Sequence, residues 1–189
     1  MIYFENEKYY SKNISHLTWD EEEFCNCEFH NLDLQNLNFK NCKFFECQFH
    51  QCNLSNLKVH YSTFRDILFS QTKAVGINWT SAKSISDLKF EESILDYSVF
   101  LGLDLKGGVF SKSSLKKVDF SGCNLKGSDY KGSDLQETSF NNSNLEMSDF
   151  RDAKNYLIDL SCTKLAKAKF SFPDALGLLK VLNIHVEGF

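Results

Sequence analysis

Apolar residues recur along this chain at every fifth position, a spacing that fits neither a helix nor a strand. A helix would place apolar residues three to four positions apart, and a strand would place them two apart. We call each of these residues a centre, and with one interruption the centres run from Phe24 to Phe170. In the stretch NLDLQNLNFKNCKFFECQFHQCNL, residues 31–54, they are Leu34, Phe39, Phe44, Phe49 and Leu54.

A smaller residue often lies two positions before each centre, as Ser128 does before Tyr130. Residues two apart on an extended chain point to the same side, so both should face inward while the residue between them faces out. The remaining residues of each repeat must turn a corner, which predicts a solenoid whose coils contact only their neighbours. The outward residue is often acidic or an amide: Asp104, Asp119, Asn124, Asp129, Asp134, Asn144, Asp149 and Asp159.

The order of the centres predicts a coil with four sides. Between Phe90 and Phe150, aromatic and leucine centres alternate. A coil with four sides would stack aromatic centres on aromatic centres and leucines on leucines, whereas a coil with three sides would mix the two kinds in each column. We therefore expect about 20 residues per coil and coils about 4.8 Å apart. The series counts through Ser84 and resumes at Phe90, which indicates one extra residue near 85–89. One extra residue in a β-ladder predicts a bulge.

Repeat units such as CNLKG, SDYKG, SDLQE, SNLEM and SDFRD resemble the pentapeptide repeat family. The resemblance implies an all-β, right-handed quadrilateral β-helix. The ending AKFSFPDALGLLKVLNIHV resembles the quinolone-resistance (Qnr-type) and microcin-immunity members, in which a short helix and a terminal strand form a dimer interface. We therefore expect an N-terminal cap in residues 1–23, the β-helix in 24–170, and a dimerising helix and strand in 171–189.

The tail itself also predicts a helix that is followed by a strand. Ser171 and Asp174 have the spacing of a capping box, and Pro173 suits a first helical turn. The apolar arc of the helix exceeds what a lid over one core can bury, which favours a homodimer. The predicted interface residues are Leu176, Leu178, Leu179, Leu182, Ile184 and Val186.

The net charge of −4 argues against direct binding of nucleic acid. The start MIYFENEKYY does not resemble a signal peptide, and no apolar run is long enough for a membrane span, so we expect a soluble cytoplasmic protein. The odd number of cysteines, seven, disfavours a disulfide framework. Most of them occupy the small inward position, where free cysteine serves as a buried hydrophobe.

No catalytic motif is present, so we predict no enzyme activity, no cofactor and no metal centre. His30 and His50 lie 20 residues apart and should be stacked, either as two polar residues or as part of a metal site. The segment WDEEEF at 19–24 is interpreted as a solvated acidic edge. Apolar residues at outward positions indicate either a partner site or a local change of register: Ile94, Tyr97, Val99, Leu101 and Val109.

The family resemblance implies a non-enzymatic protein that mimics the shape of DNA. Such members bind type II topoisomerases, DNA gyrase or topoisomerase IV, and confer protection or immunity against a toxin or an antibiotic. This sequence lacks the longer loops of the quinolone-resistance type and is closer to the microcin-immunity type. The alternative is a generic protein–protein interaction scaffold. The predicted contact residues are two pairs that should share columns, Asp129 with Asp149 and Asp119 with Asp159.

Overall fold

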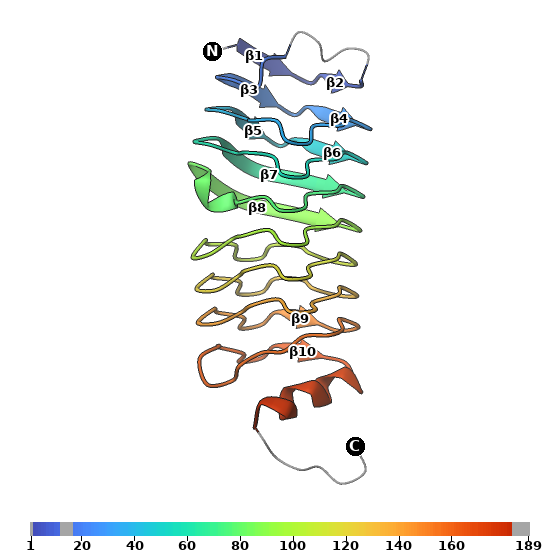
Figure 1. Ribbon diagram of the computed structural model, residues 1–189, viewed down its shortest axis with the longest axis vertical. Helices are drawn as coiled ribbons and strands as arrows, with labels where there is room; N and C mark the ends of the chain where they lie inside the picture. The colour runs from blue at the N-terminus through green and yellow to red at the C-terminus, as the bar shows by residue number, and fades with distance from the viewer. Residues whose placement is uncertain (1, 12–16, 183–189) are drawn as a thin grey trace.

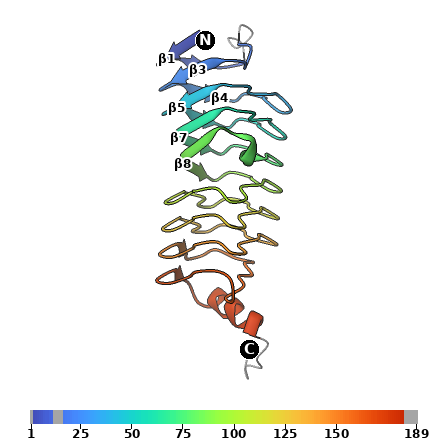
Figure 2. The ribbon, with the colours of Figure 1, turned by 90° about the vertical axis from the view of Figure 1, so that its left-hand side faces the viewer.

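The computed structural model describes residues 2–11 and 17–182, which form a right-handed quadrilateral β-helix of about eight turns (Figure 1). The coils stack along one axis, with the N-terminus at one end and a helix at the other, and a view turned by 90° shows the same rod (Figure 2). The predicted fold class is therefore confirmed. Among these described residues no helix has the length and apolarity of a membrane span.

The strands are short because each one occupies a side of a coil. Neighbouring coils pair in parallel, and Phe24 lies opposite Phe44 in the next coil, 20 residues on. Isolated bridges continue the ladder in the C-terminal half, as far as Asn144 and Lys164. The strands are β1 Ile2–Glu5, β2 Lys8–Tyr9, β3 Glu22–Cys25, β4 Glu28–His30, β5 Lys43–Phe45, β6 Gln48–His50, β7 Thr63–Ser70, β8 Ser84–Glu91, β9 Asp149–Phe150 and β10 Lys169–Phe170.

The centres fill the interior in four columns, and one column is aromatic along the whole rod. Its neighbouring rings are stacked with centroids 4.5–5.9 Å apart. Rings of the opposite column meet it edge-on, as Phe120 meets Phe110 at 69°. Both arrangements are favourable for aromatic pairs. The continuous column consists of Tyr9, Phe29, Phe49, Phe69, Phe90, Phe110, Tyr130, Phe150 and Phe170.

The small inward residues donate hydrogen bonds to the preceding coil. The Ser62 hydroxyl donates to the carbonyl of Phe39 at 2.8 Å, and the Cys52 thiol donates to the carbonyl of Phe29 at 3.3 Å. A buried hydroxyl or thiol is thus satisfied without a second side chain. The prediction of free buried cysteines is confirmed for Cys27, Cys42, Cys47, Cys52 and Cys123.

Most corners are turned by a residue with positive φ, two positions after the centre. Asn26 and Asn31 have φ of 51° and 54°, and Gly102 has φ of 73°. Glycine and asparagine tolerate this left-handed conformation best, which explains their recurrence at these sites. Glycine or asparagine two positions after a centre is therefore a sequence signal for a corner.

The solenoid begins before the predicted boundary at residue 24. Strand β1 pairs in parallel with β3, and the Phe4 ring stacks on Phe24. The interpretation of segment 19–24 as a solvated edge is wrong for Glu22, which is fully buried. Its carboxylate accepts hydrogen bonds from the backbone amides of Thr18 and Trp19, because these amides precede β3 and have no ladder partner there.

The extra residue lies upstream of the predicted 85–89. Ser84, counted as a centre, is exposed and pairs with Thr63, while Ile85 pairs with Phe64. The Lys83 amide donates to the carbonyl of Ser62 at 2.8 Å, so Lys83 and Ser84 together lie opposite the single residue Thr63. This is the predicted β-bulge. The preceding corner is a 3-10 turn, η1 Trp79–Ser81.

A second irregularity occurs at residues 155–162, next to β10 (Figure 1). The spacing of five predicts Asn155 and Leu160 as centres, but both are exposed, whereas Tyr156 and Ile158 are buried. The spacing of five predicts an inward asparagine here, but the adjacent tyrosine takes the inward position because it buries far more apolar area. The chain returns to register at buried Thr163.

The rod ends in the 3-10 helix η2, Asp174–Leu182. The backbone carbonyl of Ser171 accepts from the amide of Ala175, as expected at a helix start, but its hydroxyl contacts Asp152 rather than completing a capping box. Leu176, Leu178 and Leu179 are half-buried. The side chain of Leu182, together with Ile184, Val186 and the predicted terminal strand, lies outside the described residues.

Candidate partner-binding surface

The interior of the rod is filled by the stacked centres, so partners must bind to its outer sides. The inward set Phe120, Leu125, Tyr130 and Leu135 is fully buried, as predicted. The outward residues are half-buried rather than fully exposed, because each is flanked by the coils above and below. This applies to Asp119, Asn124, Asp129 and Asp134.

The outward aspartates have a local structural role. The Asp119 carboxylate accepts from the backbone amide of Ser121 at 2.9 Å, and Asp129 accepts from the amide of Lys131 at 2.9 Å. Such contacts two residues along the chain are those of an Asx-turn, which stabilises a tight corner. Aspartate and asparagine therefore recur at this position for folding reasons, whether or not a partner uses them.

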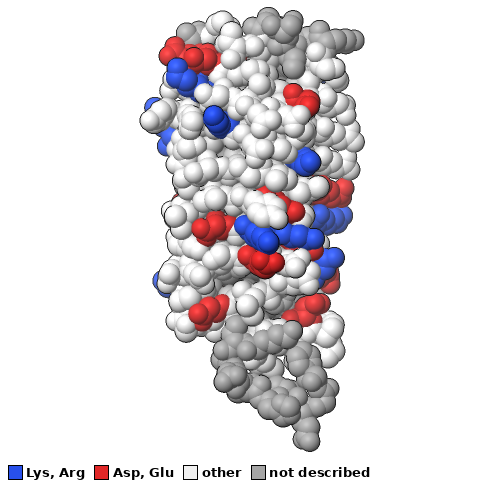
Figure 3. Space-filling model, viewed as in Figure 1, with Lys and Arg blue, Asp and Glu red and all other residues white. Residues whose placement is uncertain are grey.

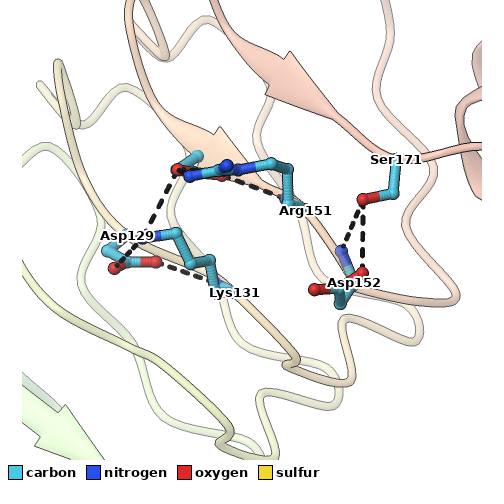
Figure 4. A network of polar contacts seen from close by, with 6 residues as sticks. Asp129, Lys131, Arg151, Asp152 and Ser171 are labelled. Atoms are coloured by element: carbon cyan, nitrogen blue, oxygen red, sulfur yellow. Dashed lines mark hydrogen bonds and ion pairs between the residues drawn. The ribbon is translucent and has the colours of Figure 1, made fainter.

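Asp129 and Asp149 lie in one column as predicted, paired across neighbouring coils. However, Asp149 is not a free acid, since its side chain is only 12% exposed. The Arg151 guanidinium binds it through two nitrogens, at 2.9 and 2.7 Å, and Lys131 reaches both aspartates (Figure 4). Hydrogen bonding from Arg151 lowers the pKa of Asp149 from its ordinary 3.8 to about 2. The column presents cations over its carboxylates.

The second predicted pair does not form a ladder. Asp119 pairs with Ser139 in the next coil, but the chain then leaves the regular path at 155–162. Within the described ranges, no bridge joins Ser139 to Asp159. Asp159 is exposed, and it accepts from the amide and hydroxyl of Ser161 at 2.8 and 2.6 Å. The prediction that Asp119 and Asp159 share a column is therefore not confirmed by the ladder.

The charge is distributed unevenly along the rod. Residues 1–103 contain 14 Asp and Glu against nine Lys and Arg, whereas residues 104–189 contain 11 against 12. The acidic end is thus opposite to the predicted contact residues. Figure 3 shows both signs interspersed on the face it presents, rather than one acidic surface.

His30 and His50 stack with ring centroids 4.9 Å apart, as their spacing predicts. His30 Nε2 lies 2.8 Å from Glu28, and His50 Nε2 lies 3.0 Å from Gln48. Burial and the neighbouring His30 lower the pKa of His50. Within residues 2–11 and 17–182, no group of three or more His, Cys, Asp or Glu is arranged to hold a metal ion.

The outward apolar residues are not the result of a changed register. Ile94, Tyr97 and Leu101 are exposed, while the centres between them, including Phe100, remain buried. The Lys117 ammonium lies 5.6 Å from the Tyr97 ring centroid and partly covers it. Ile94, Val99 and Val109 lie on three different sides of the rod, since they pair with Lys73, Asn78 and Lys89 respectively.

A family model described as "Pentapeptide repeat region" matches residues 22–100 and 84–150, well over half of the chain. The chain belongs to the pentapeptide repeat family. It is similar to a trypsin-treated variant of QnrB1, described as a plasmid-mediated fluoroquinolone resistance protein. That comparison has a TM-score of 0.70 and 18% identity, and it covers 99% of each chain.

The chain is also similar to HetL from the cyanobacterium Nostoc sp. strain PCC 7120, a pentapeptide repeat protein involved in regulating heterocyst differentiation. The TM-score is 0.64 at 15% identity, over 89% of this chain and 82% of HetL. A comparison with curated protein sequences gives no match. At these identities the two likenesses show a shared fold, and the two relatives have different roles.

Proposed function

We propose that this pentapeptide repeat protein is a non-catalytic binding protein that protects a bacterial type II topoisomerase, DNA gyrase or topoisomerase IV, from a toxin or an antibiotic. It acts in the cytoplasm as a homodimer joined through residues 171–189. The supporting observation is the regular rod with a filled interior, which matches the resistance protein QnrB1 over 99% of both chains.

The rod has the dimensions that such a role needs. Its turns number about eight, so it is about 38 Å long at about 4.8 Å per coil. Two rods joined at their C-terminal ends would span about 75 Å. A body of this length can occupy an elongated saddle that normally accepts duplex DNA without any enzymatic chemistry.

Mimicry is of shape rather than of charge. Duplex DNA about 38 Å long carries about 22 negative charges. The whole chain has a net charge of −4, and Lys131 and Arg151 pair with Asp129 and Asp149, two of the four predicted acidic contacts. Binding should therefore depend only modestly on salt.

Among the predicted contact residues, Asp119 and Asp159 remain suitable because their carboxylates point outward and bind only local backbone and hydroxyl groups. Asp129 and Asp149 are tied into the cation network, so their substitution would test stability together with binding.

The direct test is binding of the full chain to purified gyrase and topoisomerase IV, measured with the repeat protein immobilised. The double variant Asp119→Lys with Asp159→Lys should weaken binding about tenfold or more. Asp33→Lys is the matched control, because Asp33 is an exposed outward aspartate on the N-terminal coils. Equal binding by the unaltered chain, the double variant and Asp33→Lys would reject the proposed contacts. Absence of binding by the unaltered chain would reject the topoisomerase as partner.

The second candidate is an interaction scaffold with a different protein partner. The small net charge and the near-neutral C-terminal half favour it over a DNA mimic. A partner recovered from cell extract that binds the purified chain with a defined stoichiometry, combined with absent topoisomerase binding, would establish this candidate.

A further inference from the structure

A hollow of about 420 Å³ lies on the side of the rod that carries the β-bulge. Its volume falls within the range of small-molecule sites. None of the side chains that line it is acidic, and every one carries a hydrogen-bond donor. These side chains are Asn41, Lys43, Tyr61, Thr63 and Lys83.

The strand ladder brings the two lysines to either side of one hydroxyl. Lys43 pairs with Thr63 in the next coil, and Thr63 faces Lys83 and Ser84 in the coil after that. The two lysine backbones are therefore about 10 Å apart, with the threonine midway between them. Lysine side chains are long enough to reach the Thr63 hydroxyl from both directions, and Lys43 does so by leaving the Glu23 carboxylate to which its ammonium is bonded in the preceding coil.

The bulge adds Ser84 beside the second lysine, Lys83, which the regular spacing of 20 already places opposite Thr63. A regular coil would have one outward residue opposite Thr63, whereas this coil has Lys83 and Ser84. Bulges often re-aim a side chain at a binding site. Lys83 is exposed, and in the part of the chain that the structure describes no carboxylate lies within ion-pair distance of its ammonium group.

The balance of charge at the hollow is positive. The charge of Lys43 is balanced by the Glu23 carboxylate, which lies 2.9 Å from its Nζ. Among the described residues, the charge of Lys83 has no such partner and makes the hollow positive. The Tyr61 side chain forms one wall and is 70% exposed, so its ring offers a free face. A planar ring of a ligand can stack on such a face.

We propose that this hollow binds a small phosphate monoester whose phosphate lies between Lys43, Lys83 and the Thr63 hydroxyl. The planar part of the ligand stacks on Tyr61. A small molecule fits better than a nucleic acid, because this half of the chain has 14 acidic residues against nine basic ones and would repel an extended polyanion. The site is separate from the proposed topoisomerase contacts on the C-terminal coils.

The test is a titration of the isotopically labelled full chain, followed by NMR at low ionic strength, with inorganic phosphate, AMP and adenosine as probes. Phosphate and AMP should shift the amide resonances of Lys43, Thr63 and Lys83 saturably, with AMP the tighter ligand. Adenosine should not bind. Lys83→Gln should weaken both anions about fivefold, the effect of one partly exposed charge. Tyr61→Ala should abolish the advantage of AMP over phosphate.

The matched control is Lys73→Gln, an exposed lysine on the opposite side of the coil, which should leave both affinities unchanged. Equal losses in Lys73→Gln and Lys83→Gln, or shifts at all lysines without saturation, would overturn the site. Equal affinities for AMP and phosphate in the unaltered chain would overturn the stacking on Tyr61. Unchanged melting temperatures of the variants show that the fold is retained.

Discussion

Arg151 holds Asp149 in a two-point ion pair on the outer side of the last regular coils, with nitrogen–oxygen distances of 2.9 and 2.7 Å. Asp149 is nearly covered, and Lys131 binds it from the preceding coil at 3.5 Å. A residue that the repeat pattern places outward is therefore part of the packing between coils.

Removing the charge of Asp149 should reduce stability. We expect Asp149→Asn to lower the free energy of unfolding by about 1–2 kcal/mol, because bidentate charged hydrogen bonds are lost while both cations stay solvent-exposed. Urea denaturation measures the loss. Asp119→Asn is the control and should cost about 0.5 kcal/mol or less, since asparagine can keep the contact with the Ser121 amide.

The same pair predicts a dependence on pH. Because the folded pKa of Asp149, about 2, is below its ordinary 3.8, its contribution is present above about pH 4 and is lost as pH falls toward 2. The difference in stability between the unaltered chain and Asp149→Asn should shrink over this window. A difference that stays constant from pH 5 to pH 2 would show that the charge of Asp149 is unimportant.

The aromatic columns should dominate the stability of the core. Phe140, 2% exposed, stacks on Phe120 and meets Tyr130 and Phe150 edge-on. Phe140→Ala should lower the free energy of unfolding by about 3–5 kcal/mol. Leu101→Ala, at an exposed outward site, should change it by less than about 0.5 kcal/mol. A loss below about 1.5 kcal/mol for Phe140→Ala would indicate a loosely packed interior.

Deleting Lys83 should be tolerated, because it restores a coil of the regular length with Ser84 opposite Thr63. We expect the free energy of unfolding to change by less than about 1 kcal/mol. Deleting Ser114 from a regular coil is the matched control. It should unfold the protein, since a one-residue shift turns inward side chains outward. Thermal unfolding of both deletion variants tests this expectation. A similar fall in melting temperature for each would mean that the bulge is required for folding.

Assembly through the C-terminal tail predicts a change of oligomeric state. Leu179→Asp would place a charge in the proposed dimer interface and should yield monomers in analytical ultracentrifugation. The coils should remain folded, because Leu179 lies in η2 beyond the last strand. If the unaltered chain sediments as a monomer at micromolar concentration, the dimer proposal fails.

The period of five predicted most of the fold because an extended side with two inward residues and a tight corner leaves few other solutions. It failed at Ser84 and Asn155, where the spacing predicts an inward polar residue, whereas the adjacent Ile85 is half-buried and the adjacent Tyr156 is buried. At such an insertion, the side chain that buries more apolar area takes the inward position. The spacing of residues along the sequence does not show which of two neighbours that is.

The candidate site was harder to predict than the fold. The repeat pattern predicted that the side chains of Asp129 and Asp149 point outward and share a column, and the pairing of the two residues confirms the shared column. Sequence spacing did not reveal that Lys131 and Arg151, each two residues after an aspartate, would fold back over the carboxylates. By contrast, the spacing of 20 residues from Lys43 through Thr63 places Lys83 on the same side of the rod, whereas the pairing of Ser84 with Thr63 does not follow from that spacing.

Protection of a type II topoisomerase can be measured in a gyrase supercoiling assay in which the full chain is titrated against a panel of gyrase poisons. We expect supercoiling to be restored in the presence of at least one poison, Leu179→Asp to lose this effect, and excess protein alone to inhibit the enzyme. Failure to protect the enzyme against any of the poisons, together with no inhibition at high concentration, would contradict the proposed function.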